Sequence, residues 1–437
     1  MRSFTLLWCG QMVSTIGSFM TVFALTIWLW ERSASATTLA LVVFFSQLPR
    51  ILITPVAGII VDRFPRKYLM LLGDGAALVT TLSIGLLYLT EHLQIWHLYG
   101  AVAFYGCFGQ LQTLAYATSI ALLVPQQHYT RAEAMVGAVN YSAVIFAPIL
   151  AGTLYPVIGL EGIIAIDLTT FGMAMGTLLA ASIPALAHPT LSSEPSTSTE
   201  PLWAQLTFGL RYILAKPGLL AMMLGFSLFA LPNDISKALY SPMLLARSGG
   251  DAQVLGSVST AAGIGGVLGA IAISIWGGTQ RRIHGMLLGF VIAGVFKMLL
   301  ACGHSLTLWM VAHFCATLSV PLFYSCSNAI WYAKVPPHLQ GRVLAADQMV
   351  GLIIGAIAPL IAGPLADYVF EPAMRPGGVL APRFGPLFGA QPGAGMALLY
   401  AMMSLWIILV GIGGYAFRTL RHVESILPDH DAVTRSG

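Results

Sequence analysis

Charged side chains inside long apolar runs are the residues of this chain best suited to chemistry. Asp234 and Lys237 are three residues apart, so they share one face of a helix and can neutralise each other. Arg50 lies near the middle of another run, where a guanidinium needs a carboxylate or several carbonyl groups. His313 can titrate in the physiological pH range. We interpret these four residues as candidates for proton coupling, with a structural ion pair and a hydrogen-bonded core histidine as the alternatives.

A short charged turn separates two of the apolar runs. It contains Gly58, Asp62, Arg63, Arg66 and Lys67. Asp62 can pair with Arg63 or Arg66, and a charge-assisted pair of this kind can latch two helix ends and open when they separate. The spacing therefore predicts a gate at this turn, with an ordinary basic turn as the alternative.

The composition describes a protein that is solvated mainly by lipid. Of the 437 residues, 57% are hydrophobic and 9% are charged, whereas a soluble domain carries about 25% charged residues. The net charge of +4 gives no indication of nucleic-acid binding. The five cysteines contain no Cys-x-x-Cys pair, so we interpret them as small buried hydrophobes.

Twelve apolar runs are long enough to cross a bilayer, which takes about 20 residues. Cytoplasmic loops of membrane proteins are rich in Lys and Arg. With both termini in the cytoplasm, the outer loops hold only Arg32, Arg247, Arg375 and Arg383. We therefore predict an all-α integral membrane protein with twelve transmembrane helices and both termini cytoplasmic, in the inner (plasma) membrane.

The chain divides into two halves joined by a polar segment. We expect a six-helix bundle over residues 1–184 and a second over residues 218–417. Residues 185–217 are predicted to be a cytoplasmic linker, rich in Ser, Thr and Pro, that ends in a short interfacial helix. Residues 418–437 are predicted to be a loose cytoplasmic tail, and residues 367–395 an irregular cap on the outer face.

The two halves also resemble each other in sequence. Residues 124–152 align without a gap to residues 335–363, and Pro148 aligns with Pro359. Matched prolines, arginines and glycines are not explained by shared hydrophobicity alone. Two parallel six-helix repeats, related by a pseudo-twofold axis, are the plan of a transporter that rocks its halves.

Several motifs carry a family resemblance. The pattern Gly-x-x-x-Asp-Arg-x-x-Arg-Lys from Gly58 resembles the loop 2–3 signature of the major facilitator superfamily, with Pro65 where the family usually has Gly. Ala-Pro148-Ile-Leu-Ala-Gly152 resembles the helix 5 motif of proton-coupled drug antiporters of that superfamily. Together with residues 335–343, these motifs are similar to the branch that contains the macrolide exporters and the enterobactin exporter.

The resemblance implies a fold, a gate and a cavity. It implies the twelve-helix major facilitator fold, with Asp347 and Arg342 completing the inner gate. It implies a substrate cavity lined by spans 1, 4, 7 and 10, whose polar residues here are Gln11, Ser14, Tyr105, Gln110, Asn233, Tyr324 and Asn328.

The chain also departs from its relatives. Related exporters often carry an acid in span 1, where this chain has Ser18. Asp74, Asp167 and Lys297 lie on spans that are peripheral in the family, so we interpret them as packing groups.

These observations predict a secondary active transporter. We expect proton-driven efflux of a small amphipathic or hydrophobic compound, similar to a macrolide, a siderophore or a peptide metabolite, by alternating access. The alternatives are an importer or uniporter of the same fold and a non-transporting membrane sensor. We predict no enzyme activity, cofactor or metal, since no cluster of catalytic residues and no nucleotide-binding Gly-x-x-x-x-Gly-Lys motif occurs. The expected partners are a small-molecule substrate, protons and the lipid bilayer, and we expect a monomer.

Overall fold

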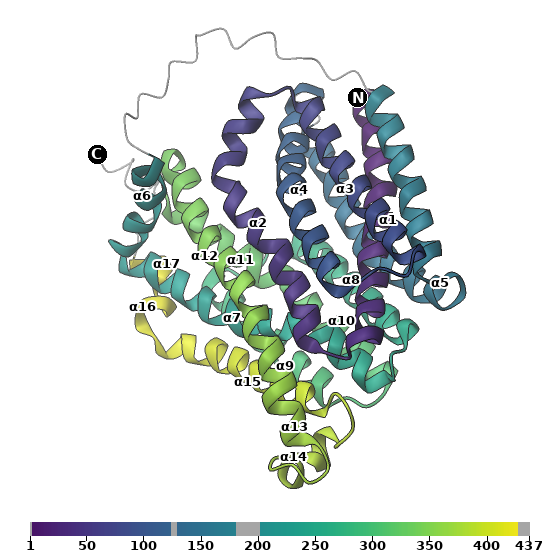
Figure 1. The fold of residues 1–437 in the computed structure, drawn as a ribbon. Helices are drawn as coiled ribbons and strands as arrows, with labels where there is room; N and C mark the ends of the chain where they lie inside the picture. The colour runs from purple at the N-terminus through teal and green to yellow at the C-terminus, as the bar shows by residue number, and fades with distance from the viewer. Residues whose placement is uncertain (1, 124–128, 181–201, 427–437) are drawn as a thin grey trace. The chain divides into compact units, whose positions relative to one another are not determined.

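The computed structural model describes residues 2–123, 129–180 and 202–426 (Figure 1). Ten helices in these ranges are long and apolar enough to cross a membrane. An all-α membrane protein was expected, and the structure agrees with that expectation. The count of twelve spans and the cytoplasmic location of both termini stay predictions.

The chain forms two compact units, which we describe separately. The first contains residues Met1–Glu194 and Leu244–Thr260, and the second contains Pro195–Met243 and Ala261–Gly437. The short segment Leu244–Thr260, at the end of one helix and the start of the next, therefore packs with the first unit.

The first unit is built on five helices: α1 (Arg2–Ser33), α2 (Ala36–Arg63), α3 (Arg66–Leu89), α4 (Ile95–Leu123) and α5 (Tyr129–Ala180). Helix α1 lies along α5, and α4 packs against both α2 and α3 (Figure 1). Helix α5 holds the predicted span 134–157 and the described residues of the predicted span 162–184 as one element. Gly159, with φ of 65°, breaks its helical geometry between them.

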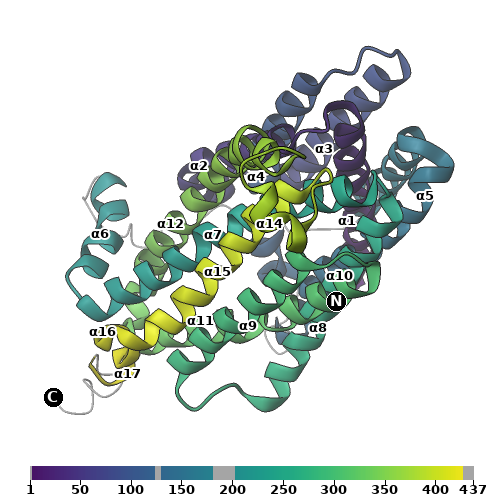
Figure 2. The same cartoon turned by 90° about the horizontal axis from the view of Figure 1, so that it is seen from below.

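The second unit contains the remaining helices, apart from the end of α7 and the start of α8, which belong to the first unit. They are α6 (Leu202–Leu214), α7 (Pro217–Ser248), α8 (Ala252–Trp276), α9 (Arg282–Cys302), α10 (Leu306–Leu318), α11 (Val320–Lys334), α12 (Pro337–Pro364), α13 (Glu371–Met374), α14 (Ala381–Phe388), α15 (Ala394–Ala416), α16 (Arg418–Arg421) and α17 (Val423–Ile426), with a π-helical turn, η2 (Leu365–Phe370). Helix α9 packs against α10, α11 and α15 (Figure 2), and α6 packs against α12.

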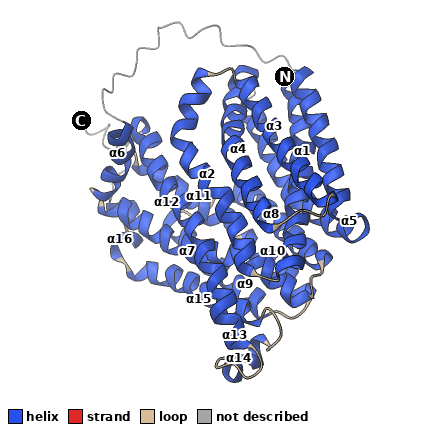
Figure 3. Ribbon diagram, viewed as in Figure 1, coloured by secondary structure: helices blue, strands red, loops and turns tan. Residues whose placement is uncertain are grey.

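Helices and their connecting loops account for all of the described residues, and none of these residues forms a strand (Figure 3). The predicted span 306–332 is divided into α10 and α11 at Ser319. Pro321, in the first turn of α11, cannot donate a backbone hydrogen bond, which explains a break at this position.

Short helices occur in residues 367–395 and in the described residues 418–426 of the predicted tail, whereas residues 427–437 lie outside the described part of the chain. Between η2 and α15, the Glu371 carboxylate accepts hydrogen bonds from the backbone N–H groups of Gly393 (3.3 Å) and Met396 (2.9 Å) at the start of α15. In the tail, the Glu424 carboxylate accepts from the N–H of Arg282 (3.2 Å) at the start of α9. Carboxylates stabilise helix N-termini because they satisfy free N–H groups and oppose the helix dipole.

The helix 5 motif lies at a close helix crossing in the first unit. A Cβ atom placed on Gly152 would lie 2.9 Å from the carbonyl oxygen of Ala252 and 3.2 Å from the Cα of Gly256, both on α8. Small residues allow membrane helices to approach this closely. Pro148 lies inside α5, and its carbonyl oxygen faces Gly256.

We predict that Gly152→Ala lowers the melting temperature of the purified protein. The added methyl group must displace the α8 backbone, and overpacking of this kind costs about 1–3 kcal/mol. Gly176→Ala is the matched control, because a Cβ there meets no atom within 4 Å. Thermal unfolding in detergent measures both variants, and equal melting temperatures would show that the crossing is looser than described.

Candidate functional site

A buried carboxyl group lies on α3 in the first unit. Asp74, on α3, is 3% exposed. The Gln11 side chain on α1 donates a hydrogen bond to its Oδ2 atom at 3.3 Å, and the Gln112 amide on α4 donates to Oδ1. No described Lys or Arg forms an ion pair with this carboxylate. The hydrogen bonds to the Asp74 carboxylate therefore come from neutral amides on two other helices.

A second carboxyl group is held in the same way. Asp167, on α5, is 1% exposed. Ser18 on α1 donates to its Oδ1 atom at 3.4 Å, and Thr81 on α3 donates to Oδ2 at 3.3 Å. These partners are hydroxyl groups, and no cation among the described residues pairs with Asp167. Both buried acids of this unit thus depend on uncharged donors.

Helix α1 connects the two carboxyl groups. Gln11 and Ser18 are seven residues apart, which is two helical turns, so they lie on one face together with Ser14. Ser14 is 4% exposed. Gln11 and Ser18 on this face bond to the buried acids on α3 and α5. The lining of a substrate cavity by Gln11 and Ser14 stays a prediction.

The other predicted polar residues of the first unit lie on α2 and α4. Tyr105 is 37% exposed, and its hydroxyl interacts electrostatically with Arg50, Asp74 and Asp167. The Arg50 side chain on α2 and Gln110 on α4 are both half-buried. The Tyr105 hydroxyl therefore lies within electrostatic range of Arg50 and of both carboxyl groups.

Hydrogen bonds connect a lysine, an asparagine and an aspartate in the second unit. Lys297 on α9 donates to the Asn233 side-chain oxygen at 2.5 Å, and the Asn233 amide on α7 donates to Asp234 Oδ1 at 3.5 Å. Lys237 is exposed, and both lysines interact electrostatically with the Asp234 carboxylate. The predicted pair of Asp234 and Lys237 thus has a third charged member.

Sequence reasoning missed the role of Lys297, which we interpreted as a packing group. Its partner on α7 is 64 residues away in the chain, so no local spacing indicates the contact. The sequence did contain one signal, the free-energy cost of placing an ammonium group in the membrane. An ammonium inside an apolar helix needs a polar partner to offset that cost. The same signal applied to Asp74 and Asp167.

Other aromatic and polar side chains of the second unit were also predicted site residues or lie close to them. Tyr324 on α11 is 44% exposed and interacts electrostatically with Asp234. Its ring centroid lies 5.4 Å from that of Phe226. Asn328, one turn further along α11, is exposed. The His313 ring on α10 lies 4.4 Å from the Tyr240 ring.

The predicted gate residues of the first unit lie where α2 ends and α3 begins. Gly58, Asp62 and Arg63 belong to the last turns of α2, and their side chains lie outside the described part of the structure. Arg66 and Lys67 open α3, and the Lys67 ammonium donates to the carbonyl oxygen of Leu179 at 3.1 Å.

The predicted gate residues of the second unit lie on α12. Arg342 is exposed, and its guanidinium carbon lies 5.5 Å from the centroid of the Phe208 ring on α6. This distance is within the range of a cation–π contact. Asp347 is half-buried. A group of three or more His, Cys, Asp or Glu side chains that could hold a metal ion does not occur among the described residues.

The sequence matches a known family and several curated proteins. The sequence model of the Major Facilitator Superfamily matches residues 7–359. Macrolide efflux protein A of Streptococcus pyogenes is 26% identical over 374 residues, which cover 81% of this chain and 88% of that protein. The multidrug efflux pump Tap of Mycolicibacterium fortuitum is 24% identical over 369 residues, which cover 80% of this chain and 86% of the pump.

Solved structures share the fold. A bacterial homologue of the iron transporter ferroportin superposes with a TM-score of 0.68 at 14% identity, over 94% of this chain and 98% of that chain. A bacterial homologue of the human lysosomal transporter Spinster superposes with a TM-score of 0.65 at 16% identity, over 98% of this chain and 95% of that one. At these identities the likeness concerns the fold alone.

We predict that Asn233→Leu destabilises the protein. Leucine keeps the size of the side chain but leaves the Lys297 ammonium without its acceptor, which costs about 1–3 kcal/mol or more for a charged group. The matched control is Asn328→Leu, at an exposed position of the same unit. Chemical or thermal unfolding in detergent compares them, and a loss no larger than that of the control would mean that the bridge contributes nothing to stability.

Proposed function

This chain belongs to the major facilitator superfamily and is a multi-pass plasma-membrane transporter, and on that premise we propose that it exports a small amphipathic or hydrophobic compound in exchange for protons. Two relatives are named as efflux proteins, one for macrolides and one for multiple drugs. These names support export and a bulky apolar substrate. A macrolide is accordingly the first compound to test.

The observation that carries the proposal is the pair of buried carboxyl groups with neutral partners. A carboxylate only accepts hydrogen bonds, whereas the protonated acid also donates one. Uptake of a proton by Asp74 or Asp167 would therefore change the net charge of the site and reverse a hydrogen bond to Gln11 or Ser18. Both changes act on α1, which the family plan places beside the substrate.

A proton supplies enough energy for useful export. One charge crossing a potential of about 100 mV releases about 2.3 kcal/mol. At about 1.36 kcal/mol for each factor of ten, this free energy sustains roughly a 50-fold concentration gradient.

Our sequence-based candidates for coupling were Asp234, Lys237, Arg50 and His313. Two ammonium groups, those of Lys237 and Lys297, interact electrostatically with the Asp234 carboxylate, whereas no described cation pairs with Asp74 or Asp167. We assign Asp234 and Lys237 to substrate orientation, and Arg50 and Tyr105 to charge compensation near the carboxyl groups. His313 stays a candidate for coupling.

The remaining assignments follow the family plan. We propose an inner gate formed by Gly58, Asp62, Arg63, Arg66, Lys67, Arg342 and Asp347. We propose a substrate cavity that includes the more exposed polar residues Tyr105, Gln110, Asn233, Tyr324 and Asn328, and a helix 5 crossing at Pro148 and Gly152 that keeps its packing while the bundles move. The twelve-helix count, the cytoplasmic termini and the monomeric state belong to this proposal.

We predict that inverted membrane vesicles accumulate a radiolabelled macrolide when their interior is made acidic relative to the outside. An uncoupler should abolish this accumulation. Asp74→Asn and Asp167→Asn should each remove the proton-driven component, since an amide carries no proton between the two sides. Both variants should retain exchange of labelled for unlabelled substrate, because exchange needs no net proton movement.

Asp234→Asn is the comparison variant. If it abolishes proton-driven uptake but spares exchange, while the other two variants behave as wild type, the coupling site lies in the second unit instead. Uptake that proceeds equally with and without the uncoupler would support a uniporter, and binding without any uptake would support a sensor.

A further inference from the structure

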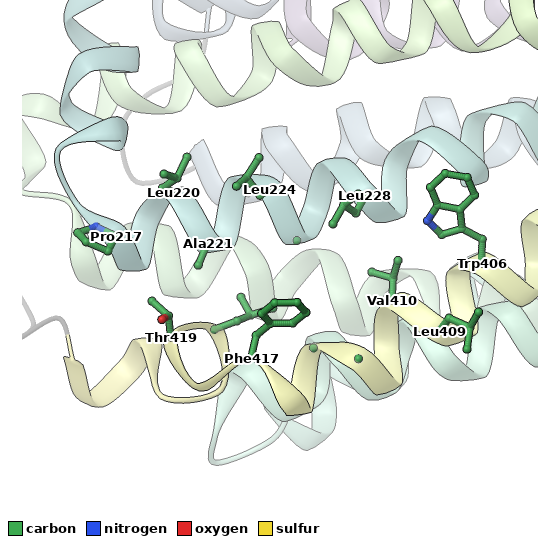
Figure 4. A pocket seen from close by; sticks show the side chains of 14 residues that line it. Pro217, Leu220, Ala221, Leu224, Leu228, Trp406, Leu409, Val410, Phe417 and Thr419 are labelled. Atoms are coloured by element: carbon green, nitrogen blue, oxygen red, sulfur yellow. The ribbon is translucent and has the colours of Figure 1, made fainter.

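A long apolar groove lies on the second unit. It has a volume of about 640 Å³ and runs between the first half of α7 and the last half of α15 (Figure 4). Leu224, Leu228 and Trp406 stand along its walls, and each is 41–50% exposed. Thr419 is the only lining residue with a polar side chain apart from the Trp406 indole.

Small residues line part of the groove: Ala221 and Gly225 on α7, and Gly413 and Gly414 on α15. A Cβ atom on Gly413 would meet no atom within 4 Å. The space above Gly413 is therefore open to a neighbouring molecule.

The length of the groove matches one leaflet of a bilayer. Its α7 wall runs from Pro217 to Leu228. The eleven steps between these two residues span about 16.5 Å at about 1.5 Å each. The hydrocarbon core of a bilayer is about 30 Å thick. Both walls belong to helices that are apolar and long enough to cross it. An acyl chain that starts at the Pro217 end would thus reach the middle of the membrane at Leu228 and Trp406.

Basic residues lie at the end where a lipid headgroup would be. Arg418 and Arg421 flank Thr419 and Leu420, which line the groove, and both arginines are exposed. Neither arginine side chain forms a hydrogen bond or an ion pair with another described residue. Lys216, next to Pro217, donates to the Tyr212 hydroxyl at 2.7 Å. This end therefore carries positive charge that complements a phosphate.

We propose that the groove is a binding site for an anionic phospholipid, with one acyl chain between α7 and α15 and the phosphate against Arg418 and Arg421. Each basic residue near an anionic headgroup contributes enough to change affinity about fivefold. The apolar wall holds any phospholipid chain, and the arginines select the anionic ones. This site is independent of the transported substrate and of the proton sites.

Native mass spectrometry of the delipidated full-length protein tests the proposal, with phosphatidylglycerol and phosphatidylcholine as probes. The wild type should bind phosphatidylglycerol more tightly. The variant Arg418→Gln/Arg421→Gln should weaken phosphatidylglycerol binding about 25-fold, that is fivefold for each charge, and leave phosphatidylcholine binding unchanged. Gly413→Leu should fill the groove and weaken binding of both lipids.

Gly172→Leu is the control for the groove. It also adds a side chain at a helical position with no atom within 4 Å of the Cβ, but on α5. Equal lipid binding by Gly413→Leu and Gly172→Leu would overturn the proposal, and so would an unchanged preference for phosphatidylglycerol in the arginine variant. If Gly413→Leu instead abolishes a dimer peak without loss of lipid, the groove is an interface between two copies of the chain. Melting temperatures of all variants separate these effects from misfolding.

Discussion

The free energy of placing charge in hydrocarbon constrains this protein more than any single contact. A polar group in a membrane helix must find its partner inside the protein, because the lipid offers none. The described residues meet this constraint in two ways. The first unit surrounds its acids with amides and hydroxyls, and the second places an asparagine between a lysine and an aspartate.

The two solutions have different chemical consequences. In the first unit, a proton on Asp74 or Asp167 changes the charge of the site and the direction of its hydrogen bonds. In the second unit, Asp234 interacts electrostatically with two lysines, so cations as well as neutral groups surround its carboxylate. The first arrangement suits a group that gains and loses protons, and the second suits a fixed polar surface that orients a ligand.

Much of the fold was predictable from local pattern, and much of the site was not. Apolar runs, turn residues and prolines act over a few residues, so the long helices and the short helix α6 could be predicted. The partners of the buried acids lie far away in the chain: Gln11 is 63 residues from Asp74, and Ser18 is 149 residues from Asp167. Hydropathy treats such residues as interruptions of an apolar run, and it does not say which helix covers them.

The polar face of α1 shows what the missing information was. The spacing of Gln11, Ser14 and Ser18 places them on one face, and this is visible in the sequence. The direction of that face depends on how α1 is rotated against α3 and α5, which only the packed structure defines. Because two acids on different helices bond to this one face about two turns apart, a proton on either acid acts on the same helix. Helix α1 thus contacts both acids directly, since Gln11 and Ser18 lie only about 10 Å apart along its axis.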